Sequence, residues 1–201
     1  MEGKLADIIK GFIKKPILLW YKACTKLLAV NENIILFESN LGRNYTGNPK
    51  AIWEEMVRQG LDKKYKCYFI LEDVKTIIPG EVKKVKKNRL RYFYLFAIAG
   101  VWVSDSRFPM YIIKRDKCKY IQTWHGTPLK KLGLDMDSVF MAGETTLDSY
   151  KKNFYENTQT WDYLISQNHY STEIFRRAFA FDKDMLEVGY PRNDLLFQRN
   201  N

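Results

Sequence analysis

The sequence of 201 residues is poor in the side chains that build disulfide or metal frameworks. It contains three cysteines, Cys24, Cys67 and Cys118, which are scattered and form no CxxC pair. This usage favours a reducing compartment and argues against a disulfide-stabilised or zinc-binding fold. Histidine is scarcer still, with only His125 and His169. Within these residues, any chemistry that depends on imidazole must therefore use one of these two side chains.

Long hydrophobic runs are also missing. The longest, at 92–103, has about a dozen residues, whereas a membrane-spanning helix needs about 20. Lysines interrupt the apolar stretches near the N-terminus, and no small-residue cleavage pattern follows them. The sequence therefore predicts neither a membrane-spanning helix nor a secretory signal peptide.

The chain does have a globular composition and an excess of positive charge. With 46% hydrophobic and 28% charged residues, it can form one domain with a core or one half of a two-domain enzyme. The formal charge of +10 points to nucleic acid, a membrane surface or phosphorylated substrates. The most basic stretch, KKVKKNRLR at 83–91, lacks the context of a nucleic-acid-binding motif. We expect it to be a solvated face or part of a membrane-facing surface, with no nucleic acid bound.

Residues 1–30 form a separate basic segment. Its apolar residues recur at helical spacing, and its six lysines against Glu2 and Asp7 give a charge of about +4. Because Pro16 divides the segment, the pattern predicts a pair of basic amphipathic helices. Two interpretations remain open: attachment in the plane of an anionic membrane surface, or packing on the domain with the lysines solvated.

Strands and helices alternate over residues 31–201. The strand-like runs are NIILFES, YKCYFILED, GVWVSDS, KYIQTW, WDYLIS and MLEVGYP. The helical stretches are 50–59, a segment with Tyr150 and Phe154 on one face, and 171–179 with Ser171 as its cap. This alternation predicts an α/β domain of Rossmann type, a parallel sheet with helices on both faces. Ligands of such sheets bind beyond the carboxyl ends of the strands, which here carry SNLGRNY, SDSRF, HGTPLK and GYPRND.

The segment QTWHGTPLKKLG contains the clearest chemical signal. His125 follows a strand, and Gly126 lets another molecule approach the backbone. An imidazole there can accept a proton from an attacking hydroxyl near neutral pH. Thr127 is expected to cap a helix beginning at Pro128, whose first amides would bind an anion together with Lys130. A histidine bonded to the backbone and a lysine extended into solvent remain the alternatives.

The other strand-end segments offer further polar groups. The turn in SNLGRNY can cradle phosphate through backbone N–H groups with an arginine added, although an ordinary glycine turn also explains it. In GYPRND a tight turn explains the glycine and proline but not the arginine. The candidate phosphate- or substrate-binding residues are Asn40, Gly42, Arg43, Gly126, Thr127, Lys130, Arg192, Asn193 and Asp194. In SDSRF we expect Asp105 or Ser106 to act as a cap and Arg107 to pair with a carboxylate.

Four blocks occur in order and together resemble the CDP-glycerol glycerophosphotransferases, the primases and polymerases of wall teichoic acid and related capsule polymers in Gram-positive bacteria. They are ESNLGRNYTGNPKAIWEEM, QTWHGTPLKKLG, WDYLISQNHYSTEIFRRAF and VGYPRNDLLF. The resemblance runs from about residue 33 to residue 201. It implies a GT-B architecture of two Rossmann-like halves, of which this chain matches the N-terminal, acceptor-side half. The donor half is expected to be missing, so the isolated chain is expected to be inactive.

The resemblance also implies a reaction. Members of the family transfer glycerol phosphate from CDP-glycerol to a hydroxyl of a lipid-linked poly(glycerol phosphate) acceptor and release CMP. They work peripherally at the cytoplasmic face of the cell membrane, without a metal or other cofactor, and CDP-glycerol is expected to bind mainly through the missing half. The family's essential histidine corresponds to His125. The alternatives are a CDP-ribitol transferase or a nucleotide-sugar glycosyltransferase of the same architecture, or a non-catalytic module that binds acceptor at a membrane surface.

Overall fold

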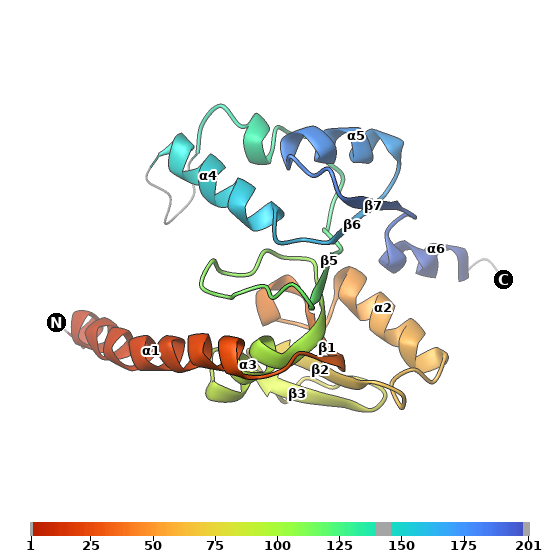
Figure 1. Cartoon of the computed structure of the whole chain (residues 1–201). Coiled ribbons are helices and arrows are strands. Elements are labelled where there is room, and N and C mark those ends of the chain that lie inside the picture. Colours follow the sequence, from red (N-terminus) through yellow and green to blue (C-terminus); the bar gives the residue numbers. More distant parts are fainter. Residues whose placement is uncertain (1, 140–145, 199–201) are drawn as a thin grey trace.

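The computed structural model describes residues 2–139 and 146–198, with side chains from residue 15 onward. The described residues form a seven-stranded parallel sheet in the order β3-β2-β1-β4-β5-β6-β7 (Figure 1). The strands are β1 (Asn31–Glu38), β2 (Lys66–Leu71), β3 (Val82–Lys86), β4 (Ala99–Ser104), β5 (Lys119–Gln122), β6 (Tyr163–Ser166) and β7 (Asp184–Glu187). The α-helices are α1 (Glu2–Leu27), α2 (Gly47–Arg58), α3 (Leu90–Ile98), α4 (Leu147–Thr158), α5 (His169–Ala178) and α6 (Leu195–Gln198). This topology confirms the expected Rossmann-like α/β fold.

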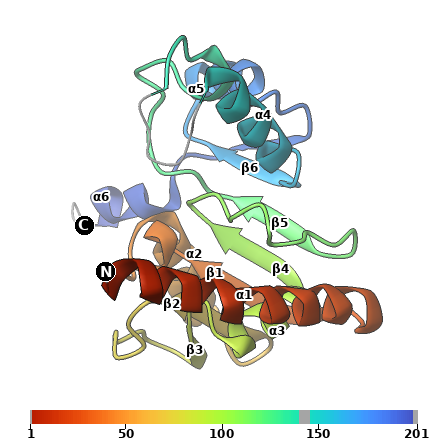
Figure 2. The same cartoon turned by 90° about the vertical axis from the view of Figure 1, so that its left-hand side faces the viewer.

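Helices cover both faces of the sheet because successive strand residues point to opposite sides. In β1, Ile34 and Leu36 join a core with residues of α1 and α3, while Ile35 and Phe37 pack with Trp53 of α2. Figure 1 shows α1 and α3 on one side of the central strands and α2 on the other, and in Figure 2 the side that carries α1 faces the viewer. A strand that is covered on both faces is mostly apolar rather than alternating, which is why the run of apolar residues in NIILFES predicts a strand.

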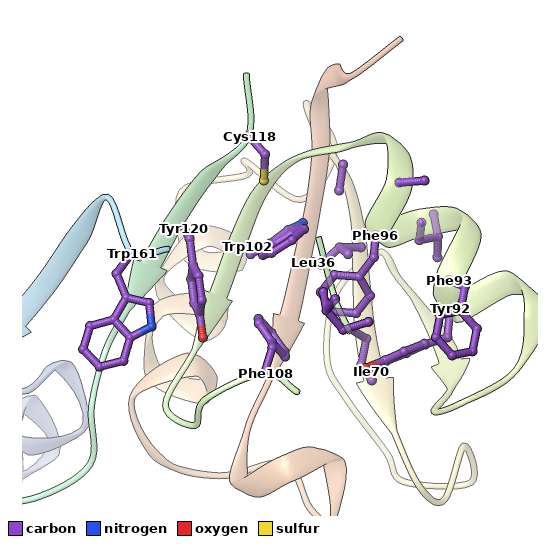
Figure 3. Packing of buried hydrophobic residues seen from close by; sticks show 14 of the residues in the cluster. Leu36, Ile70, Tyr92, Phe93, Phe96, Trp102, Phe108, Cys118, Tyr120 and Trp161 are labelled. Carbon is purple, nitrogen blue, oxygen red and sulfur yellow. The ribbon is translucent and has the colours of Figure 1, made fainter. Parts of the chain in front are cut away.

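Aromatic rings fix β4 and β5 relative to each other. Trp102 of β4 meets Tyr120 of β5 edge to face, with ring centroids 5.7 Å apart, and Phe108 contacts both rings (Figure 3). Such pairs contribute about 0.5–1.5 kcal/mol each beyond the burial of their area. The loops that follow these two strands are therefore carried by a well-packed base.

Helix α1 corrects one expectation, because it is a single helix with Pro16 inside it rather than a pair. An internal proline removes one backbone hydrogen bond and costs about 3 kcal/mol. Packing in the second half of the helix offsets this cost: Tyr21 and Cys24 are buried, and the Tyr21 hydroxyl accepts a 2.9 Å hydrogen bond from the N–H of Ile113. This half of α1 packs on the domain beside α3. In the part of the chain that the structure describes, no helix is long and apolar enough to span a membrane.

Strand β3 is not predicted from the sequence, because it lies within the basic stretch KKVKKNRLR. Val85 is its buried residue, whereas Lys83, Lys84 and Lys86 are exposed. The strand forms one edge of the sheet. Lysines on an edge strand discourage pairing with another sheet. The charges that make the segment look unlike a strand in the sequence therefore suit its position at the edge.

Two helices begin earlier than expected. Helix α2 begins at Gly47, three residues before the predicted stretch, and α5 begins at His169. The cap of α5 is Asn168, whose side chain accepts a 3.0 Å hydrogen bond from the N–H of Ser171. Ser171, the expected cap, is instead buried in the first turn. Asparagine and serine are about equally good caps, so the choice between them depends on where the preceding strand ends.

Candidate functional site

Three loops meet where the strand order reverses, at the carboxyl ends of β1, β4 and β5. The N–H of Asn40, after β1, donates a 2.8 Å hydrogen bond to Oδ1 of Asp105, after β4. The backbone oxygen of Asp105 in turn lies 2.8 Å from Nδ1 of His125, after β5. Ligands of open parallel sheets bind at such a reversal point. The structure therefore brings the predicted residues Asn40 and His125 together, and Asp105 is the residue that joins them.

The contact with Asp105 defines the tautomer of His125. A carbonyl oxygen can only accept a hydrogen bond, so Nδ1 of His125 carries the proton and donates it. In the neutral ring the lone pair is then on Nε2. Because the residue is exposed, this arrangement presents a proton acceptor to a ligand at the carboxyl edge of the sheet.

The turn after β5 corrects another expectation, since it does not begin a helix. Residues 123–132 are irregular and lead to a short 3-10 turn, Gly133–Asp135. The hydroxyl of Thr127, the expected cap, is 2.7 Å from Oε1 of Gln167 and donates to it. Gly133 adopts a φ of +56°, outside the helical region. A site built from helix-start amides is therefore wrong for this segment.

Side chains from distant segments hold the turn in place instead. Nδ2 of Asn48, in the first turn of α2, donates to the backbone oxygens of Thr123 at 3.1 Å and Trp124 at 3.0 Å. The hydroxyl of Tyr190, after β7, donates to the backbone oxygen of Gly126 at 2.8 Å. Both side chains are buried, and burial raises the pKa of Tyr190 to about 12, so its hydroxyl stays a donor at neutral pH.

Trp124 has an unusual backbone conformation directly before His125. Its φ of +51° lies in the left-handed region, which bulky residues rarely occupy. Its ring stacks on the imidazole of His125 with centroids 4.6 Å apart and also contacts Phe179 at 4.7 Å. Asn40 and Leu41, on the facing loop, also have positive φ values of 45° and 59°. Backbone outliers of this kind gather at functional sites.

Two hollows open beside His125. The larger, about 580 Å³, lies between the loops after β1, β4 and β5 and helix α4. Arg107 lines it, and its guanidinium lies 4.6 Å from the centroid of the Phe154 ring. A smaller hollow of about 360 Å³ adjoins the turn itself. The predicted residues that line this second hollow are Gly126, Thr127 and Lys130.

The remaining predicted residues lie elsewhere. Arg192, Asn193 and Asp194 line a separate cavity of about 580 Å³ against α2. Arg43 is exposed in the turn between β1 and α2. Gly42 is buried against the end of β2, where its backbone oxygen accepts a 2.6 Å hydrogen bond from the N–H of Glu72. Arg192 therefore lines a different cavity from His125, although Asn48 contacts both turns.

Two buried carboxylates lie at this edge of the sheet. Burial raises the pKa of Asp105, an effect that hydrogen bonds from Ser106 and Asn40 partly offset. Burial also raises the pKa of Glu38, the last residue of β1, to about 7, although Nζ of Lys87 lies 3.4 Å from its Oε1. In the residues that the structure describes, no group of three or more histidine, cysteine, aspartate or glutamate residues is arranged to hold a metal ion.

Sequence reasoning missed three of the residues that build this site. Asn48 lies just before the predicted start of its helix. The sequence indicates only that Tyr190 belongs to a turn and that Trp124 ends a strand. Their roles depend on hydrogen bonds and ring contacts between segments that are far apart in the chain. The available signal was positional: each lies at or next to a strand-end segment that already carried candidate residues.

Comparisons with known proteins agree with this fold. The family model for CDP-glycerol:poly(glycerophosphate) glycerophosphotransferase matches residues 20–201. A teichoic acid poly(glycerol phosphate) polymerase of Staphylococcus epidermidis is 49% identical over 173 residues, which are 86% of this chain and 24% of that protein. A teichoic acid glycerol-phosphate transferase of Staphylococcus aureus is 38% identical over 98% of this chain and 50% of its own length. Ribitol-phosphate polymerases of the same organism are only 28% and 29% identical.

A solved structure supports the same relationship. The wall teichoic acid polymerase TagF superimposes with a TM-score of 0.88 at 43% identity, covering 98% of this chain and 49% of that one. The chain thus spans between about a quarter and a half of the length of these relatives, and its sheet fits the first Rossmann-like half of a GT-B architecture. The chain belongs to the CDP-glycerol:poly(glycerophosphate) glycerophosphotransferase family.

Proposed function

We propose that the protein carrying this chain transfers glycerol phosphate from CDP-glycerol to a hydroxyl of a poly(glycerol phosphate) chain. In this reaction the acceptor oxygen forms a bond to the phosphorus of the glycerol phosphate group, and the bond from that phosphorus to the oxygen of CMP breaks. Nε2 of His125 accepts the proton of the attacking hydroxyl, and CMP leaves. The observation that carries the proposal is the 2.8 Å hydrogen bond from Nδ1 of His125 to the backbone of Asp105, which leaves Nε2 as the acceptor.

The surroundings of His125 suit an anionic acceptor with hydroxyl groups. Arg107 lines the larger hollow and Lys130 the smaller one, so each of the two hollows that His125 lines contains a positively charged side chain. Cations arranged around a phosphoryl group stabilise the charge that develops during its transfer. A base held in position typically contributes about 10²–10⁴-fold to the rate.

The experiment replaces His125 by asparagine in the full-length protein and measures CMP release and polymer growth. We expect turnover to fall by at least about 10²-fold with only a modest loss of thermal stability, since the residue is exposed and Asn48 and Tyr190 still hold the turn. His169→Asn is the matched control, because it removes the second, exposed histidine, and it should retain activity. Unchanged turnover in His125→Asn would remove His125 from the mechanism.

The donor is proposed to be CDP-glycerol rather than CDP-ribitol. Relatives named for glycerol phosphate are 38–49% identical to this chain, compared with 28–29% for those named for ribitol phosphate. Assays of the full-length protein with CDP-glycerol, CDP-ribitol and nucleotide sugars separate the possibilities. Turnover with CDP-ribitol alone would reverse the assignment.

We propose in addition that α1 holds the protein against the cytoplasmic face of the cell membrane as a peripheral protein. The face of α1 that points away from the domain exposes Lys15, Leu19, Trp20, Lys22, Lys26 and Leu27. Apolar side chains with flanking lysines suit the interface of an anionic bilayer, where each basic residue contributes about 1 kcal/mol.

Liposome flotation of the full-length protein tests this proposal. Binding to vesicles with phosphatidylglycerol should be strong, and Leu19→Glu or Trp20→Glu should weaken it about tenfold or more. Ile77→Glu is the matched control, because Ile77 is an exposed apolar residue outside α1. Equal losses from all three substitutions, or none, would rule out α1 as the attachment surface.

A further inference from the structure

Asn48 uses both ends of its amide to connect two turns that are far apart in sequence. Its Nδ2 donates to the backbone oxygens of Thr123 and Trp124, at 3.1 and 3.0 Å. Its Oδ1 accepts from the N–H of Arg192 at 3.3 Å. With the side chain 1% exposed, no water is needed to satisfy these groups, and each contact depends on the orientation of the amide.

The two carbonyl groups that Asn48 holds belong to the residues just before His125. Trp124 adopts a φ of +51°, a conformation that persists only where the surroundings impose it. The direction of the chain leaving Trp124 sets where the imidazole lies relative to the backbone oxygen of Asp105, 2.8 Å from Nδ1. A change of conformation at Trp124 would therefore move His125 away from the bond that fixes its tautomer.

The approach of α2 to this region is also built into the backbone. Gly47, next to Asn48, has a φ of +67°, and a Cβ atom at that position would lie 3.1 Å from Oδ2 of Asp105. Glycine thus permits the start of α2 to pack close to Asp105 and to bring Asn48 within reach of the turn. Gly47 and Asn48 together therefore reach the loops after β4, β5 and β7.

We propose that Asn48 is a positioning residue for His125, holding the strained turn at Trp124 so that Nδ1 of His125 stays bonded to Asp105. Through Arg192 it also ties the turn after β7 to the histidine turn. The kinetic part of this inference rests on the proposed function of His125, whereas the placement of the ring can be tested without it.

The test uses Asn48→Asp in the full-length protein. This change keeps the shape of the side chain but replaces the donor by an oxygen that faces two carbonyl oxygens, so the turn loses both hydrogen bonds. Asn88→Asp is the matched control, because it makes the same charge change at an exposed residue at the far edge of the sheet. Asn48→Ser, whose hydroxyl is neutral, provides a milder variant should the aspartate prevent folding.

Two readouts separate positioning from general stability. In the ¹⁵N spectrum of the imidazole groups, the signals that are lost in His125→Asn identify His125, which in the parent protein should show the fixed Nδ1–H tautomer. In Asn48→Asp or Asn48→Ser it should show a mixture of tautomers. The kcat for CMP release should fall about 10²-fold while the KM for CDP-glycerol changes less than about twofold, and Asn88→Asp should leave both unchanged.

The outcomes are distinguishable. A folded Asn48 variant with an unchanged His125 spectrum overturns the proposal, whatever happens to kcat. Equal losses of kcat in the Asn48 and Asn88 variants also overturn it. If the parent protein shows no transfer from CDP-glycerol, the proposed function fails, and a change in the His125 tautomer in the Asn48 variants still supports the positioning role.

Discussion

Trp124 stacks on His125 from a backbone conformation that its own side chain disfavours. The two rings lie 4.6 Å apart at an interplanar angle of 27°, and Trp124 has a φ of +51°. A left-handed conformation costs an L-residue roughly 1–2 kcal/mol. The contacts of the indole with His125, Phe175 of α5 and Phe179 offset that cost, so the strain and the packing at this residue can be separated experimentally.

Substitution of Trp124 by glycine and by alanine separates them. Both changes remove the ring and should destabilise the protein by about 3–5 kcal/mol. Trp124→Gly should nevertheless be more stable than Trp124→Ala by about 1 kcal/mol, because glycine adopts a positive φ freely. Urea denaturation measures the difference. At Ala23, an exposed residue of α1, glycine should instead cost up to about 1 kcal/mol relative to alanine; the same order at both positions would contradict a strained turn.

The pH dependence of stability should report the burial of Glu38. Burial raises its pKa from the usual 4.5 to about 7 in the folded protein. Between these values the folded protein binds more protons than the unfolded chain, so stability falls as the pH rises from about 4.5 to 7. The loss is of order 3 kcal/mol at most.

Glu38→Gln removes this titration. Comparing the melting temperatures of the parent and the variant at pH 5 and pH 8, we expect the parent to lose more stability than Glu38→Gln on going to pH 8. The control is Glu32→Gln, which changes an exposed glutamate at the start of the same strand and should leave the pH profile of the parent unaltered. Parallel profiles for the parent and Glu38→Gln would show that Lys87 neutralises the effect of burial.

Three glycines give a graded test of close packing. A Cβ atom on Gly133 would lie 2.3 Å from the backbone oxygen of Ala178 and 2.6 Å from Cε1 of Phe154, at a φ of +56°. Gly133→Ala should therefore cost about 3 kcal/mol or more. Gly60→Ala, with open space but a φ of +69°, should cost about 1 kcal/mol. Gly126→Ala, with neither restriction, should be near neutral, and any other order by thermal denaturation would contradict the packing around Gly133.

The sequence predicts those parts of the fold that depend on local pattern. Runs such as NIILFES and YKCYFILED have a continuous apolar centre that is buried on both faces, so they are recognisable as central strands. The edge strand β3 is not recognised in the sequence because it has one buried residue among lysines. The continuity of α1 through Pro16 cannot be predicted from the sequence, because it depends on the packing of Tyr21 against the segment at Ile113. No local pattern reveals this contact.

In the candidate site too, local features are predictable from the sequence and long-range contacts are not. His125 and Asn40 are predicted because chemistry at strand ends is visible in the sequence. The expected helix at Thr127 is wrong because its hydroxyl bonds to Gln167, a residue 40 positions away. Asn48 and Tyr190 could not be assigned for the same reason: a buried amide and a buried hydroxyl become meaningful only when the carbonyl groups they reach are known.

The conformation of the turn at Trp124–Gly126 is consequently determined by other segments of the chain. Helix α2, the loop after β4 and the segments after β6 and β7 each supply one of its restraints, so the residues WHGTP alone do not determine its conformation. Grafting this pentapeptide onto another scaffold would not reproduce the imidazole geometry, and a portable version would have to include all four supporting segments.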